Sequence, residues 1–162
     1  MTIDKTIVER ELAEAWADLG RALDGLSDDE MLLPGVIEEW SVKDLLGHIA
    51  FWAEKAAHDL ALLQEGRGGD IETPGGDAGT DEWNRREAER RRGQTLKEAR
   101  SECEAAHEAS VAAFRAVPVE LLDQEVKGAG MASRFGGDTF WHYREHAQQI
   151  RAWRRQLETT EE

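Results

Sequence analysis

Apolar residues recur at steps of three and four along four stretches of this sequence, the period of a helix with one buried face. The stretches cover residues 3–25, 42–65, 96–117 and 140–157. A shorter helical stretch begins near Asp81 and is interrupted at Gly93. No segment shows the two-residue alternation of a half-buried strand. The pattern predicts an all-α fold, a four-helix bundle.

A single domain over residues 1–162 is the expectation from the length. Residues 66–80 and 118–138 are rich in glycine and each contains a proline, so both are predicted as long loops. The first loop lets the chain return along the bundle, so that the second and third helices run parallel. The tail over residues 159–162 is expected to fray.

Acidic residues outnumber basic ones by 34 to 20, which gives a formal net charge of −14. This charge opposes nonspecific binding to nucleic acids and to anionic membranes. The apolar runs are too short to cross a bilayer, and the charged first 14 residues do not resemble a signal peptide. The single cysteine cannot form an internal disulfide. We therefore expect a cytoplasmic protein without a nucleic-acid or membrane partner.

Two histidines, His142 and His146, are spaced so that one helix face can present both. Four residues advance a helix by about 400°, which leaves the two imidazoles only about 40° apart. Such a pair can hold one metal ion. The simpler interpretation is two polar residues that flank the core.

A third histidine, His48, lies among Leu45, Ile49 and Trp52 on the second predicted helix. A bulky polar ring in such a position is partly buried and needs a partner. Placed against the last helix, it would supply a third nitrogen. Three neutral histidines with one open position are the ligand set of catalytic zinc, and the same set suits nickel. The alternative is a hydrogen-bonded core histidine.

The segment from Glu39 to Trp52, EWSVKDLLGHIAFW, resembles the tryptophan-serine-helix-histidine signature of the DinB-like superfamily. His142-Tyr-Arg-Glu-His146, with Ile150-Arg-Ala-Trp153 after it, resembles the terminal His-x-x-x-His helix of that superfamily. Trp83-Asn84 resembles the DfsB and ClbS branch of these four-helix-bundle proteins. The resemblance covers nearly the whole chain.

This resemblance implies a bundle of up-down-down-up order, often dimeric, with one divalent metal held by His48, His142 and His146. The superfamily includes thiol-dependent transferases and isomerases, and proteins that protect cells from stress or reactive metabolites. We therefore expect a small metal-dependent transferase, isomerase or hydrolase that acts on an electrophilic small molecule. Its expected cofactor is one zinc or nickel ion, with a low-molecular-weight thiol as cosubstrate, and its expected state is a homodimer. The alternatives are a noncatalytic protein that sequesters a small molecule and an interaction module.

Further residues have two interpretations each. Trp52 and Trp141 either line an apolar substrate pocket or pack in the core. Trp83 and Asn84 either close the pocket mouth or begin a helix. Asp44 lies one turn before the histidine of the second helix, and it either orients that imidazole or caps the helix.

Four other side chains are not expected to take part in metal binding or catalysis. Glu145 is rotated by about 100° from its histidine neighbour, so it is expected to face solvent. His58 and His107 lack a partner at helical spacing and are expected at the surface or at the shoulder of the buried helix face. Cys103 falls on the apolar stripe of its helix, where a small buried hydrophobe is expected rather than a nucleophile.

Overall fold

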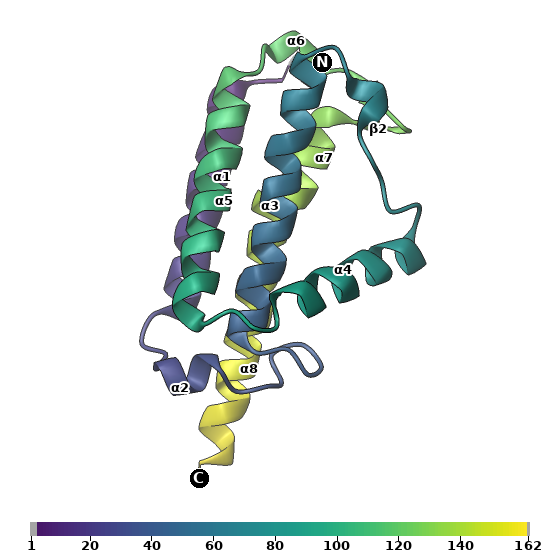
Figure 1. The fold of residues 1–162 in the computed structure, drawn as a ribbon. Coiled ribbons are helices and arrows are strands. Elements are labelled where there is room, and N and C mark those ends of the chain that lie inside the picture. The colour runs from purple at the N-terminus through teal and green to yellow at the C-terminus, as the bar shows by residue number, and fades with distance from the viewer. Residues whose placement is uncertain (1–2, 162) are drawn as a thin grey trace.

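Four long helices form a bundle in the computed structural model, which describes residues 3–161. They are α1 (Lys5–Leu23), α3 (Val42–Gln64), α5 (Leu96–Ala116) and α8 (Phe140–Thr160), and Figure 1 shows them side by side. The predicted all-α fold class is confirmed.

Side chains at the helix starts explain where the long helices begin. The Ser41 hydroxyl accepts from the backbone N–H of Asp44, and the Asp44 carboxylate accepts from the backbone N–H of Ser41. Thr95 and Glu98 form the same reciprocal pair before α5, and Asp4 caps α1. These caps satisfy backbone donors that the first turn of a helix leaves free.

Ion pairs show that α1 and α8 run in the same direction. The Glu11 carboxylate lies 2.6 Å from the Arg144 guanidinium, and the Asp18 carboxylate lies 2.7 Å from that of Arg151. Both pairs step by seven residues in each helix, which only parallel helices allow. The two helices therefore stay in register over at least two turns.

The helices α3 and α5 also run parallel to each other. The Lys43 ammonium at the start of α3 donates to the carbonyl of Gln94, just before α5, at 2.6 Å. The Lys5 ammonium at the start of α1 donates to the Val117 carbonyl at the end of α5, at 2.7 Å. The pair α3 and α5 therefore runs opposite to the pair α1 and α8, as Figure 1 shows.

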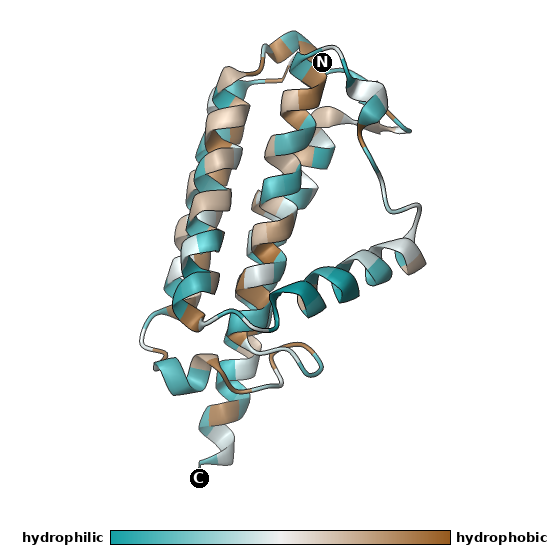
Figure 2. Cartoon of the chain, viewed as in Figure 1, coloured by the Kyte–Doolittle hydropathy of each residue, from teal (hydrophilic) through white to brown (hydrophobic). Residues whose placement is uncertain are grey.

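The core lies between the inner faces of these four helices. Its largest fully buried side chains include Leu12, Leu19, Leu45, Ile49, Leu60, Phe114, Phe135 and Tyr143. Figure 2 shows the hydrophobic positions as stripes along the bundle helices. None of the helices within residues 3–161 has the length and apolarity that a membrane crossing requires.

The prediction of a long loop over residues 118–138 is wrong, because most of this segment is regular secondary structure. It holds α6 (Val119–Leu122), a two-stranded hairpin of β1 (Glu125–Val126) and β2 (Ala129–Gly130), and α7 (Met131–Asp138). The tail is also more regular than expected, since α8 continues to Thr160; Glu162 lies outside the described residues.

The glycines that indicated a loop serve specific geometries instead. Lys127 and Gly128 have φ angles of 49° and 84°, and they form the two-residue turn between the hairpin strands. Gly136 lies inside α7, where an added Cβ would come within 2.8 Å of the Phe140 ring. No side chain among residues 3–161 caps α8, and the Thr139 hydroxyl instead donates backwards to the Phe135 carbonyl of α7.

The chain between α3 and α5 forms a separate helix that projects from the bundle. After η1 (Gly68–Asp70), α4 (Asp77–Arg91) begins four residues earlier than predicted, and the predicted break at Gly93 is confirmed. Figure 1 shows α4 leaving the bundle sideways, and Figure 2 shows that much of it is hydrophilic. The remaining short helix, α2 (Asp28–Met31), follows α1.

A buried ion network fastens the C-terminal end of α4 to the bundle. The Arg91 guanidinium is 8% exposed and lies 2.6 Å from the Glu87 carboxylate and 2.8 Å from that of Glu102 on α5. The apolar core contributes little here, since Glu87 and Arg91 are the buried residues of α4. The position of α4 therefore depends on this charge cluster.

We expect Arg91→Met to lower the free energy of unfolding by about 3 kcal/mol, because two carboxylates would lose their buried cation. Urea titration followed by circular dichroism measures this change. The matched variant Arg92→Met removes an exposed guanidinium from the same helix end and should change stability by less than about 0.5 kcal/mol. Equal losses for both variants would contradict the role of Arg91.

Candidate metal centre

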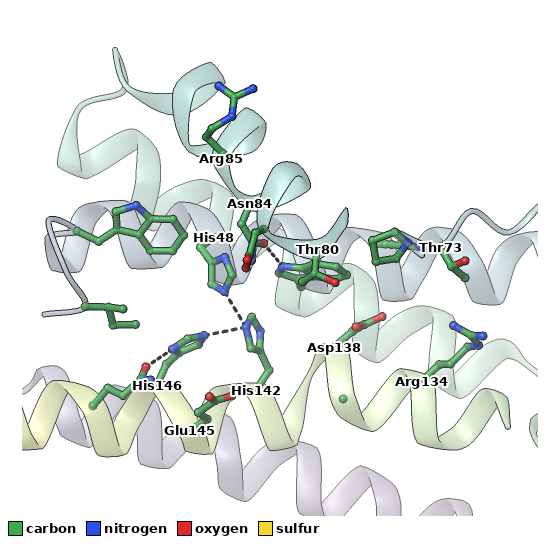
Figure 3. A pocket seen from close by; sticks show the side chains of 18 of the residues that line it. His48, Thr73, Thr80, Asn84, Arg85, Arg134, Asp138, His142, Glu145 and His146 are labelled. Carbon is green, nitrogen blue, oxygen red and sulfur yellow. Dashed lines mark hydrogen bonds between the residues drawn. The ribbon is translucent and has the colours of Figure 1, made fainter. Parts of the chain in front are cut away.

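Three histidines from two helices meet at one point of the bundle. The Nε2 atom of His142 lies 2.8 Å from Nε2 of His48 and 2.7 Å from Nε2 of His146. His48 belongs to α3, and the other two belong to α8 (Figure 3). One ligand atom from each residue lies within 4.8 Å of the others. The structure thus brings together the three residues that the sequence selected.

Hydrogen bonds alone do not account for this contact. A ring nitrogen of a neutral imidazole either carries one hydrogen or has one lone pair. Nε2 of His142 therefore forms one good hydrogen bond and not two, although it has two neighbours at hydrogen-bond distance. A divalent cation accepts lone pairs from all three nitrogens at once. The donor set and its convergence fit a transition-metal ion.

A neighbouring amide orients one of these rings. Nδ1 of His146 lies 2.6 Å from Oε1 of Gln149, one turn further along α8. An amide oxygen only accepts, so Nδ1 carries the hydrogen and Nε2 keeps its lone pair toward the other histidines. Nδ1 of His142 is buried, and it has no hydrogen-bond partner among the described residues.

Burial keeps all three imidazoles neutral. Burial, together with the charge of nearby groups such as His146, lowers the pKa of His48 to about 3, and burial and the two neighbouring histidines hold the pKa of His142 well below its usual value. Burial also lowers the pKa of His146, which the hydrogen bond to Gln149 partly offsets. Neutral imidazole is the form that binds a metal, so the rings are ready to ligate at neutral pH.

The three histidines line a cavity of about 910 Å³. The Trp40 ring covers His48 from the loop before α3, with 5.0 Å between the ring centroids. One turn after His48 on α3, the indole Nε1 of Trp52 donates to Oδ1 of Asn84 on α4, at 2.9 Å. The cavity therefore has walls from the bundle, from α4 and from the loop before α3.

The end of the cavity formed by α3 and α7 carries charges of both signs. Lys55 and Asp59 form an ion pair on α3 at 2.6 Å. Two further side chains of the cavity come from α7. Arg134 donates to the backbone carbonyl of Val126, and Asp138 also lines the cavity. Burial raises the pKa of Asp138 to about 7, with the charge of Asp59 acting in the same direction and those of Lys55 and Arg134 against it. This end is suited to polar or ionic groups.

The predicted pocket residues divide into two groups. Trp52 and Asn84 line the cavity, whereas Trp83 and Trp141 do not. Trp83 stacks behind Trp52, with 6.1 Å between their ring centroids. Trp141 is 52% exposed, because one residue rotates it by about 100° from the neighbouring histidine. The pocket interpretation of Trp83 and Trp141 is therefore wrong.

Asp44 caps α3 and does not orient an imidazole. Its carboxylate accepts from the backbone N–H of Ser41 at 2.9 Å and from the Ser41 hydroxyl at 3.0 Å. It forms no hydrogen bond with any of the three histidines. Of its two interpretations, the capping role is the one that the structure supports.

The structure agrees with the expected positions of three further side chains. His58 is exposed, as expected. Cys103 is buried, and burial raises the pKa of its thiol to about 12, so it is not a nucleophile. Glu145 is exposed as expected, but it also lines the cavity beside the histidines, as Figure 3 shows.

The surface position expected for His107 is wrong. Its side chain is buried, its ring stacks on Trp16 at 4.1 Å, and its Nδ1 lies 3.1 Å from the Tyr143 hydroxyl. The signal was present in the sequence, because His107 follows Cys103 and precedes Ser110 at helical spacing on the buried stripe of α5. Its partners come from α1 and α8, which the local pattern does not reveal.

Several cavity residues were not singled out as site candidates from the sequence, among them Trp40, Lys55, Asp59, Arg134 and Asp138. Lys55 and Asp59 continue the face of His48 at steps of three and four, so helical spacing would have found them. The α7 residues lay in a segment that the sequence predicted as a loop.

Comparison with known proteins places the chain in a family. The family model described as the mycothiol maleylpyruvate isomerase N-terminal domain matches residues 12–147. The chain belongs to this family. The family is part of the DinB-like superfamily, so the resemblance seen in the sequence is confirmed.

A solved structure shares the fold. The crystal structure of an uncharacterised protein from Escherichia coli UTI89 matches with a TM-score of 0.81 and 14% sequence identity. The match covers 95% of this chain and 94% of that chain. At this identity the match supports the fold alone. No curated protein matches the sequence.

The buried His107 predicts a pH-dependent stability that is separate from the metal centre. Burial lowers its pKa to about 4, below the unfolded value of about 6.5. Below about pH 6.5 the unfolded chain binds a proton at this residue that the folded chain does not, so acid destabilises the fold. The stability of wild type relative to His107→Phe should fall by about 2 kcal/mol from pH 7 to pH 4, after allowance for solvent screening. Urea titrations at each pH measure this, and a constant difference would contradict it.

Proposed function

We propose that this protein is a metal-dependent enzyme that uses a thiol cosubstrate to transform an electrophilic small molecule. The observation that carries the proposal is the convergence of three neutral imidazole nitrogens in a cavity of about 910 Å³. Membership of the mycothiol maleylpyruvate isomerase N-terminal domain family supports isomerisation as the reaction class and mycothiol as the thiol. Zinc and nickel are the metals that the three-histidine set favours.

The composition of the cavity supports an external nucleophile. No cysteine lies among the described residues that line it, and the thiol of Cys103 is buried elsewhere with a raised pKa. A nucleophile in this cavity must therefore enter with a ligand or as water. A bound divalent ion would lower the pKa of a thiol or water and so supply that nucleophile at neutral pH.

The chain's own residues would bind and orient the reactants. His48, His142 and His146 hold the ion from two helices that the bundle keeps rigid. The rings of Trp40 and Trp52 exclude water beside them and offer apolar contact. The charged end of the cavity offers both hydrogen-bond donors and acceptors to polar groups of a substrate or thiol.

The second candidate function is noncatalytic sequestration of a reactive small molecule. The size of the cavity favours it, since about 910 Å³ is large enough for a complete organic ligand. In this case the ligand would bind through contact area and desolvation, and its affinity would not require the metal. Metal content and turnover distinguish the two functions.

We expect protein purified without a polyhistidine tag to contain about one divalent transition metal per chain, because three imidazoles select such ions over calcium or magnesium. Elemental analysis by mass spectrometry measures the content. The His142→Ala, His146→Ala double variant should lose the metal, whereas the exposed control His58→Ala should retain it. A folded double variant with full metal content would refute the assignment.

Turnover separates catalysis from binding. With zinc and mycothiol present, the protein should isomerise maleylpyruvate, as followed by ultraviolet absorbance, and His48→Ala should lower kcat/KM by about 100-fold or more. The same variant should lose much less of its affinity for maleylpyruvate, as measured by calorimetry, than of its turnover, since most of the cavity remains. Tight binding without turnover, with or without metal, would favour sequestration.

A further inference from the structure

The indole of Trp52 determines which way the Asn84 side chain faces. Its Nε1–H lies 2.9 Å from Oδ1 of Asn84. An indole nitrogen donates and does not accept, so the amide atom that contacts it must be the oxygen. The Asn84 amide is therefore held in one orientation, with its NH₂ group on the side away from the indole.

That NH₂ group is available to a ligand. Asn84 lines the cavity, and its Nδ2 donates to none of the residues in the described part of the chain. Nδ2 is also not among the buried side-chain atoms that lack a partner, so water or a ligand can reach it. The group is a free donor at the surface of the cavity.

The helix geometry places this donor near the histidines. His48 and Trp52 lie one turn apart on the same face of α3, a rise of about 6 Å. Asn84 is bonded to Trp52 and lines the same cavity as His48, His142 and His146. Figure 3 shows Asn84 and the three histidines around the same cavity.

The three cationic side chains that line the cavity are already paired. The Lys55 ammonium is paired with Asp59. The Arg134 guanidinium donates to backbone carbonyls of the hairpin. The Arg85 guanidinium is exposed and paired with Glu82. Among these side chains, the Asn84 amide is the donor that an incoming oxygen atom meets without breaking an existing bond.

We propose that the Asn84 NH₂ group donates a hydrogen bond to an oxygen atom of the ligand bound at the three histidines. The ligand class is a carboxylate or carbonyl compound, with one oxygen toward the histidines and an acceptor oxygen toward Asn84. Trp52 is then a positioning residue that fixes the amide. This inference rests on the proposed metal site and assigns a residue of α4 to recognition of the substrate oxygen.

The test uses the Co²⁺-loaded protein, whose visible absorption reports ligand binding. Acetate is the oxygen probe, because it accepts a hydrogen bond, and 2-mercaptoethanol is the sulfur probe. We expect Asn84→Leu to weaken acetate binding about tenfold or more, the size of a lost hydrogen bond to a charged group. Its affinity for 2-mercaptoethanol should stay within about twofold of wild type, because a bound sulfur makes little use of the amide donor.

Two further variants test the parts of the argument. Asn84→Asp keeps an acceptor for the Trp52 indole and nearly the same shape, but it replaces the donor by an oxygen, so acetate binding should weaken at least as much. Trp52→Phe keeps an aromatic ring and removes the indole donor, so acetate binding should weaken less than in Asn84→Leu. Glu89→Gln, on the exposed side of α4, serves as the control and should bind both probes like wild type.

The outcomes are distinguishable. Suppose that Asn84→Leu and Asn84→Asp each bind one Co²⁺ per chain and bind acetate as tightly as wild type does. That result would overturn the role of Asn84 and leave the metal site intact. An equal loss for acetate and 2-mercaptoethanol in Asn84→Leu would also overturn it, since that result indicates a general change of the cavity. Failure of the wild-type protein to bind Co²⁺ would overturn the metal site and this inference together.

Discussion

The contact between α3 and α8 through three imidazoles is the constraint on which the rest of the structure depends. Three polar rings that lose water and lack a full set of hydrogen bonds disfavour the folded state. The bundle offsets this cost with an apolar core on both sides and with the parallel, ion-paired packing of α1 against α8. Because α8 is held by α1 over several turns, His142 and His146 cannot move apart to relieve their contact with His48.

The helix α4 is attached to this bundle in a different way. None of its apolar side chains is fully buried, and its C-terminal end is fixed by the charges around Arg91. Toward the cavity it is fixed by the hydrogen bond between Trp52 and Asn84 and by the stacking of Trp83 on Trp52. A helix held by a few polar contacts can change its sequence without changing the core. It is therefore a suitable carrier of substrate-recognition residues.

The sequence was most informative where local rules decide the structure. Helical periodicity located the long helices, and a step of four residues placed His142 and His146 on one face. The sequence was least informative where contacts between residues far apart in the chain decide the structure. The glycines of residues 127–137 looked like a loop, because the ring of Phe140 that requires Gly136 becomes apparent only in three dimensions. His107 is buried for a similar reason, since its partners Trp16 and Tyr143 belong to other helices.

The cavity separates chemistry from recognition along the chain. The three imidazoles come from the rigid interior of α3 and α8, whereas much of the remaining wall comes from the loop before α3, from α4 and from α7. Substitutions in those surrounding segments alter the shape and charge of the cavity and leave the histidine geometry unchanged. A bundle of this kind could therefore keep its histidine cluster and change its ligand through the wall, with the α7 side chains of Arg134 and Asp138 as positions where the charge of the wall can be altered.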